Sequence, residues 1–118
     1  MDVRVRILYV NLQPDQKKGR NIPKYVLLSQ FTDQGIRNVG NTTKREAAFE
    51  KEIAGKFGVT VSQMLWTLGQ YDMVAIVEAP NDESIAACSL SVGKLGNIKI
   101  QTLRAFQASE VDSLLQKV

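Results

Sequence analysis

The chain has 118 residues, of which 44% are hydrophobic and 23% are charged, values typical of one globular domain. It has no histidine and one cysteine, which excludes a Ser-His-Asp triad, a histidine-ligated haem or zinc site and an internal disulfide. It has no apolar run of about 18 residues, as a membrane span would need, and its polar, alternating start is unlike a signal peptide. We therefore expect a cytoplasmic protein with no metal site and no cofactor.

The excess of basic charge is confined to the first 24 residues. They hold six basic and two acidic side chains, a net charge of +4, whereas the rest holds nine basic and ten acidic, a net charge of −1. The folded part therefore has no basic stripe that could follow a phosphate backbone. Nucleic-acid binding through the arm is the weaker alternative to no nucleic-acid partner.

Residues 3–10 alternate apolar and polar side chains, which is typical of a strand with one solvent-facing side. Residues 11–21 are polar and rich in turn residues, so they are expected to form a connector. Two interpretations stay open for this arm, residues 1–23. It is either a functional segment, as an extra edge strand or an arm that reaches a partner subunit, or an appendage in front of the domain, residues 24–118.

The domain opens with a strand and a helix. Residues 25–31 are mostly apolar and predict the strand. Thr43 and Glu46 have the spacing of a capping box at a helix start, and Gly58 is placed to end that helix. Three large apolar residues at a spacing of four are expected to form its buried side: Phe49, Ile53 and Phe57.

A hairpin follows, because the apolar runs 59–68 and 73–79 are separated by the short turn 69–72. Asp82 is placed to cap a second helix. Five residues are expected to form the apolar side of that helix: Ile85, Ala86, Cys88, Leu90 and Val92.

Residues 98–106 predict the fourth strand, and a short C-terminal helix is expected to open at residues 109–112. The predicted order is therefore β-α-β-β-α-β followed by a helix. This α+β order is the split βαβ arrangement with an antiparallel sheet.

Several separated motifs lie in order along residues 24–116: Tyr25-Val-Leu-Leu, Phe31-Thr-Asp-Gln-Gly-Ile-Arg, Thr43-Lys-Arg, Trp66-Thr-Leu-Gly-Gln-Tyr-Asp, Val77-Glu-Ala-Pro, Leu95-Gly-Asn-Ile and Gln101-Thr-Leu-Arg-Ala-Phe. Together they resemble the GYD domain family, which is named for the motif in the turn. The resemblance implies a ferredoxin-like domain of the dimeric α/β-barrel kind and assigns no biochemical role.

Both faces of the predicted sheet are apolar. Met73, Ala75 and Val77 point to one side, while Val74 and Ile76 point to the other. A sheet that is apolar on both faces needs a second layer on each. We therefore expect a homodimer, or a higher even oligomer, that pairs through the sheet face.

Four residues near the hairpin and on the fourth strand are candidate ligand contacts: Trp66, Tyr71, Asp72 and Arg104. If Trp66 and Arg104 lie near one another across strands, the guanidinium can stack on the indole or hold a ligand carboxylate. Tyr71 and Asp72 either face a cavity or serve the turn, where the carboxylate would accept from backbone amides.

Asp33 and Arg37 are further candidates, because residues 32–37 follow a strand and precede a helix. Free amides at such a place can hold an anion, and an ordinary capped loop is the alternative. Cys88 is expected to be a small core residue, since no base lies near it in the sequence.

A weaker resemblance connects Gly69-x-Tyr-Asp, Val77-x-Ala-Pro-Asn-Asp and Leu95-Gly-Asn-Ile to the effector domains of feast/famine transcription regulators. It implies a small-ligand sensor, although the helix-turn-helix half of such regulators is absent from this sequence. The preferred hypothesis is thus a dimeric small-ligand-binding or sensor protein. One alternative is a cofactor-free oxygenase or isomerase, with Asp72 or Glu78 as base and Arg104 stabilising an anion. The other is a structural or interaction domain.

Overall fold

The computed structural model describes residues 22–118. Apolar runs between turn residues pair into one antiparallel sheet with the strand order β2-β3-β1-β4. Its strands are β1 (Lys24–Phe31), β2 (Thr60–Trp66), β3 (Met73–Glu78) and β4 (Ile98–Ala105). All four predicted strands are confirmed, with small shifts at their ends.

The helical segments are α2 (Asp33–Arg37), η1 (Val39–Asn41), α3 (Thr42–Ala48), η2 (Phe49–Ile53), η3 (Ala54–Phe57), α4 (Asp82–Gly93) and α5 (Ala108–Leu115). Segments α3, η2 and η3 follow one another without a break, as α, π and 3-10 turns. Together with α4 and the sheet they make the ferredoxin-like βαββαβ fold that the sequence predicts.

The predicted buried side of the first helix is confirmed, because Phe49, Ile53 and Phe57 pack against the core. A π turn holds more residues than an α turn, which helps side chains spaced by four to stay on one side. Gly58 ends the helix in the left-handed region, with φ of 71°. A side chain there would be strained.

Two details of the predicted helix starts are wrong. Thr43 does not open a capping box, since η1 already leads into α3 and the residue before α3, Asn41, makes no side-chain cap. The second helix is capped by Asn81, whose Oδ1 accepts from the Ser84 amide at 2.8 Å. Asp82 instead accepts a hydrogen bond from the Tyr25 hydroxyl at 2.6 Å.

The apolar side of α4 is narrower than expected. Ile85 and Cys88 are buried, whereas Ala86 is exposed and Leu90 is 74% exposed. The helix therefore contacts the core through a stripe and leaves Leu90 facing solvent.

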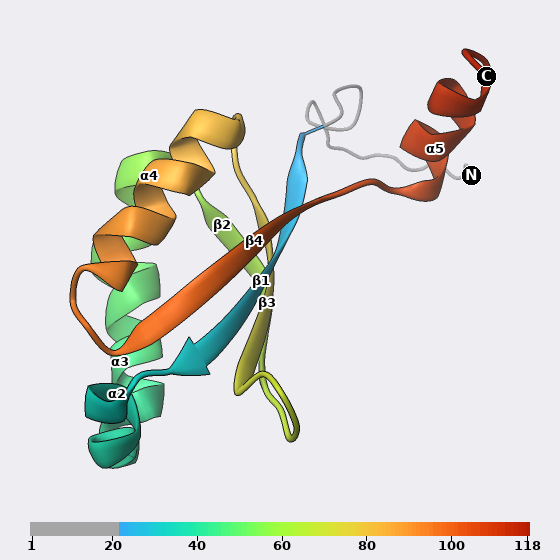
Figure 1. Ribbon diagram of the computed structural model, residues 1–118. Helices are drawn as coiled ribbons and strands as arrows, with labels where there is room; N and C mark the ends of the chain where they lie inside the picture. Colours follow the sequence, from blue (N-terminus) through green and yellow to red (C-terminus); the bar gives the residue numbers. More distant parts are fainter. Residues whose placement is uncertain (1–21) are drawn as a thin grey trace. The chain divides into compact units, whose positions relative to one another are not determined.

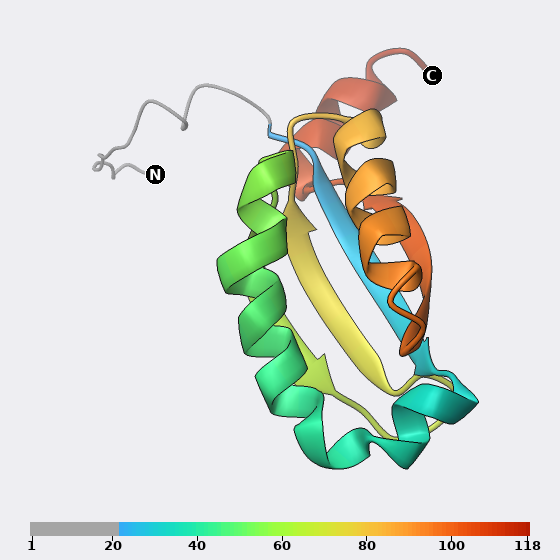
Figure 2. The ribbon, with the colours of Figure 1, turned by 90° about the vertical axis from the view of Figure 1, so that its left-hand side faces the viewer.

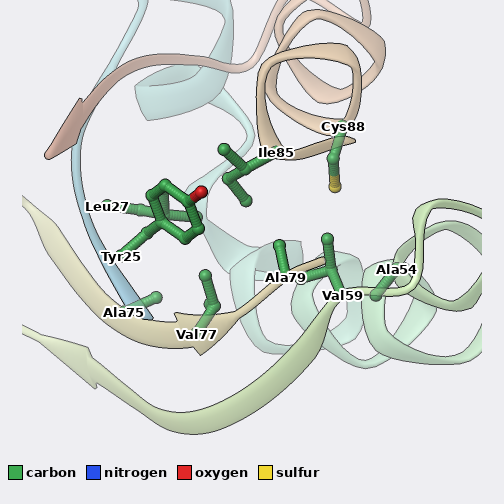
Figure 3. Packing of buried hydrophobic residues seen from close by; sticks show 9 residues of the cluster. All are labelled: Tyr25, Leu27, Ala54, Val59, Ala75, Val77, Ala79, Ile85 and Cys88. Carbon is green, nitrogen blue, oxygen red and sulfur yellow. The ribbon is translucent and has the colours of Figure 1, made fainter. Parts of the chain in front are cut away.

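The helices α3 and α4 cover the same face of the sheet (Figure 1 and Figure 2). Burial alternates along β1 and β3, with the buried residues beneath the helices. Figure 3 shows the packed core formed there by residues from β1, β3, two loop positions and two helical segments: Tyr25, Leu27, Ala54, Val59, Ala75, Val77, Ala79, Ile85 and Cys88.

Within residues 23–106 no helix covers the other face of the sheet (Figure 1). The strand register places six apolar residues on this open face: Val26, Leu28, Leu65, Val74, Ile76 and Leu103. Leu65 is 46% and Leu103 is 38% exposed, while the four on β1 and β3 are half-buried by their neighbours. The predicted apolar character of both faces is thus confirmed.

Residues Pro23–Phe106 form one compact unit, and the C-terminal residues Gln107–Val118 belong to another. The predicted C-terminal helix is confirmed as α5, which has a capping box between Gln107 and Glu110. The predicted strand and connector at residues 3–21 lie outside the described residues. None of the helices in residues 22–118 is both long and apolar enough to cross a membrane.

Candidate functional site

A cavity of about 220 Å³ lies between the sheet and the helices that cover it. Small side chains on facing elements leave this space, among them Ser29 on β1, Ala75 on β3 and Ser89 on α4. Most of the wall is apolar, with its larger members Leu27, Phe49, Met64, Met73, Ile98 and Ile100. Since Leu27, Ala75 and Cys88 also belong to the packed core, the cavity adjoins that core.

Glu46 brings a carboxyl group into this apolar wall. It lies on α3, three residues before Phe49 and seven before Ile53, on the side of the helix that faces the sheet. Its Oε2 atom is buried and has no hydrogen-bond donor in the part of the chain that the structure describes. Burial, a hydrogen bond to Glu50 and the negative charge of Glu50 raise the pKa of Glu46 to about 8. At neutral pH the group is therefore mostly a carboxylic acid.

Two other polar groups of the wall are already engaged. The Arg45 guanidinium donates to the carbonyl oxygens of Asn38 at 2.8 Å and Gly35 at 3.5 Å. The Ser89 hydroxyl lies 3.2 Å from that of Thr102. Among the described residues, Glu46 is the wall residue with a buried polar atom that has no hydrogen-bond partner.

Cys88 also lines the cavity, and burial raises the pKa of its thiol to about 11. It stays protonated at neutral pH and is not a thiolate nucleophile. This agrees with the expected role of Cys88 as a core residue.

None of the six residues predicted from the sequence as ligand contacts lines this cavity. Two of them bond to wall residues: the Trp66 Nε1 donates to the Thr42 hydroxyl at 3.0 Å, and the Asp72 amide donates to the Ser29 carbonyl at 2.8 Å. Trp66 lies on β2 and Arg104 on β4, at opposite edges of the described sheet, so the cross-strand proximity that stacking would require is not found within one chain.

Tyr71 and Asp72 connect the hairpin turn to the neighbouring strands. The Tyr71 hydroxyl donates to Gln101 on β4 at 2.8 Å. The Asp72 carboxylate accepts from the Phe31 amide at 2.8 Å, and the Asp72 amide donates to the Ser29 carbonyl at 2.8 Å. These bonds match the alternative in which the carboxylate serves the backbone near the turn.

Arg104 lies near the C-terminal end of β4. Its guanidinium carbon lies 4.4 Å from the centre of the Phe106 ring and 5.6 Å from that of Tyr25, within the range of cation–π contacts. Burial and the hydrogen bond to Asp82 raise the pKa of Tyr25 to about 12. Arg104 therefore packs on aromatic rings beside the start of α4.

Asp33 and Arg37 are both exposed and occupy the two ends of the short helix α2. The expected loop is thus a helix of five residues. Its Gly35 amide already donates to the Thr32 hydroxyl at 3.0 Å. Anion binding by this segment stays a prediction that these contacts do not favour.

Sequence reasoning missed Glu46 as a site residue, although a signal was present. The spacing from Thr43 indicated a capping box, but the spacing to Phe49 and Ile53 places the same carboxyl on the buried side of the helix. An acidic residue on the apolar stripe of a helix is the feature that could have found it.

The profile of the GYD domain matches residues 25–115. The chain belongs to the GYD domain family. A protein of Thermus thermophilus, named "Glutamine synthetase and cystathionine beta-lyase binding protein", is 30% identical over 95 residues. The alignment covers 80% of this chain and all of that protein. No solved structure is significantly similar to the chain.

In this GYD domain the motif residues make contacts that position the sheet. Gly69 has φ of 108°, a conformation that favours glycine. Tyr71 and Asp72 bond to β4 and β1 respectively. The GYD motif therefore joins the hairpin turn to the two strands beyond it, while the cavity is formed by other residues.

Proposed function

We propose that this GYD-domain protein is a small-ligand-binding regulator that acts as a homodimer and binds a protein partner. The cavity at Glu46 carries the ligand-binding part of the proposal. An apolar cavity of about 150 Å³ is large enough to bind benzene, so about 220 Å³ can hold a small organic molecule. A cytoplasmic location and a ligand role for Trp66, Tyr71, Asp72, Arg104, Asp33 and Arg37 stay predictions.

The open face supports the homodimer. Polar groups lie at the margins of its six apolar residues. At one end of the sheet Lys24 and Glu78 form an ion pair of 2.8 Å, and on the outer strand β4, beside Leu28, Gln101 accepts from the Tyr71 hydroxyl. An apolar centre with a polar rim is the usual composition of a protein interface. Two copies related by a two-fold axis would cover each other's apolar centre.

The similarity to a protein named for binding two enzymes supports the protein partner. We infer that this chain, too, binds a metabolic enzyme. Its candidate partners are glutamine synthetase and cystathionine beta-lyase from the same organism as the chain. Surface plasmon resonance with each purified enzyme tests this inference, with serum albumin as the control surface. Binding no stronger than to albumin for both enzymes would contradict it.

Native mass spectrometry of the purified protein tests ligand binding and assembly together. We expect the mass of a dimer, and after incubation with pooled metabolites a discrete added mass that disappears on denaturation. A thermal-shift screen of the same pool should find compounds that raise Tm, since a ligand that binds the folded state stabilises it. A monomer would contradict the homodimer, and a pool without effect in both assays would contradict ligand binding.

A cofactor-free enzyme is the second candidate. The raised pKa of Glu46 makes this residue a better candidate for the base than the two carboxylates named from the sequence, Asp72 and Glu78. Asp72 holds the Phe31 amide and Glu78 is paired with Lys24, so both have structural contacts. In an enzyme of this kind Glu46 would be the general base. Chemical conversion of a bound compound by the wild type, and its loss in Glu46→Gln, would favour this candidate.

A further inference from the structure

The Glu46 carboxyl is the chemically distinctive group of the cavity wall. Its Oε2 is enclosed and lacks a donor among residues 22–118. A buried carboxylate is costly unless it gains a proton or a cationic partner. A cation that reaches this carboxyl from the cavity would therefore stabilise its charged form.

The charged groups near Glu46 do not supply that cation. Arg45 donates to the carbonyl oxygens of Asn38 and Gly35. Glu50 adds negative charge, and Glu52 lines the same cavity. The facing group on α4 is the Cys88 thiol, which is neutral. These surroundings favour a positive charge in the cavity.

The remaining wall determines the body of the ligand. Leu27, Phe49 and Ile100 are among the apolar side chains that surround the space. They offer few hydrogen bonds, so a strongly hydrated group would lose more than it gains there. The available volume of about 220 Å³ fits a single ring or a short chain with one polar end.

We propose that the cavity binds a primary amine with a small apolar body, whose ammonium group replaces the proton of Glu46 beside Glu50. The inference rests on the proposed ligand-binding function and names the chemical class of its ligand. The ammonium donates to the Glu46 carboxylate, and the displaced proton leaves to solvent. No covalent bond forms or breaks other than that to the proton.

Binding of such an amine is linked to pH. Because the pKa of Glu46 is raised to about 8, amine binding at pH 7 releases close to one proton. The association constant should rise about fifty-fold between pH 6 and pH 8, as the carboxylate becomes available. The Cys88 thiol, with its pKa raised to about 11, and the amine itself keep their protons over this range.

Isothermal titration calorimetry of the full chain with 2-phenylethylamine and 2-phenylethanol tests the proposal. The two probes have nearly the same shape and differ in charge. At pH 8 we expect the amine to bind at least tenfold more tightly than the alcohol. Titrations at pH 7 in two buffers of different ionisation enthalpy should report the released proton. Glu46→Gln should remove the preference, whereas Glu83→Gln, an equal charge change outside the cavity wall, should keep it.

The outcomes separate this inference from the proposed function. If the alcohol binds as well as the amine, or Glu46→Gln keeps the preference, the amine inference is wrong while ligand binding stands. If neither probe binds and the metabolite pool is also without effect, both are wrong. If Glu46→Gln does not fold, the variant Glu50→Gln tests the amine proposal in its place. Its lost carboxylate should shift the pH profile of amine binding to lower pH, and an unshifted profile overturns the proposal.

Discussion

Burial of Glu46 makes the stability of the fold depend on pH. The pKa of this carboxyl is raised from its ordinary value of 4.5 to about 8, first by burial and then by Glu50. The folded chain therefore binds more protons than the unfolded chain between these pH values. The free energy of unfolding should fall as pH rises through this range, because the charged carboxylate is the disfavoured form in the fold.

Glu46→Gln should remove this loss, since a neutral amide cannot ionise. Each pKa unit corresponds to about 1.4 kcal/mol, and partial exposure reduces the effect. The difference in free energy of unfolding between Glu46→Gln and wild type should therefore shift in favour of the variant by about 1 to 3 kcal/mol from pH 5 to pH 9. Urea unfolding at pH 5, 7 and 9 measures it. Glu83→Gln, which leaves the cavity wall unchanged, should follow the wild-type profile. A difference between Glu46→Gln and wild type that does not change with pH would contradict the account.

Asp72 offers a second test at a single residue. Asp72→Ala removes the acceptor of the Phe31 amide and should lower the free energy of unfolding by about 1 to 3 kcal/mol. Asp72→Asn keeps an oxygen at this position and should lose less. Urea unfolding of both variants distinguishes them. If Asp72→Asn lost as much ligand affinity as Asp72→Ala while its stability stayed unchanged, the result would instead favour the ligand role predicted from the sequence.

The contact between α2 and the segment before β4 requires a residue without a side chain at Gly35. A Cβ atom at Gly35 would lie 1.9 Å from the carbonyl oxygen of Asn97, a backbone atom that cannot move alone. The Thr32 amide donates to the same oxygen at 3.1 Å, so the two segments are already bonded there. The glycine allows the close approach that joins the end of β1 to the start of β4.

Gly35→Ala should therefore force these elements apart and destabilise the fold by about 3 kcal/mol. Gly40→Ala is the matched control, because nothing lies within 4 Å of an added Cβ there. Thermal unfolding followed by circular dichroism should show a clearly lower Tm for Gly35→Ala and little change for Gly40→Ala. Equal Tm values in the two variants would show that the close contact does not hold the elements.

Local patterns predicted the elements well, and contacts between distant elements poorly. Phe49, Ile53 and Phe57 identified the buried side of a helix because their spacing matches one face. The strand order was not readable from a hairpin alone, so the separation of Trp66 from Arg104 was missed. The cavity could not be predicted either, since small residues from several strands and helices create it only when they face one another.

The open face determines how whole molecules are expected to meet. Ile76 lies on β3 between Val26 of β1 and Gln63 of β2, within the apolar part of that face. If two copies cover each other there, a charge at this position would be buried without a partner. The helical side offers Leu90 for comparison, since this leucine is 74% exposed.

If the proposed dimer forms through this face, Ile76→Lys should be a monomer, whereas Leu90→Lys should remain a dimer. Size-exclusion chromatography with light scattering measures both masses at several concentrations. Circular dichroism checks that each variant is folded. A folded Ile76→Lys variant that stays dimeric would show that the copies pair through another surface.

The irregular pairing of β2 affects whether further chains can add to the edge of the sheet. Among the described strands β2 lies at an edge of the sheet, and its register against β3 shifts between Val61 and Gln63. A regular edge can recruit the edge of another chain, and that chain can recruit the next, which leads to filaments. A bulge bends the strand and interrupts the ladder that a newcomer would extend. Growth along this edge is therefore discouraged, which favours a discrete particle over a fibre even at high protein concentration.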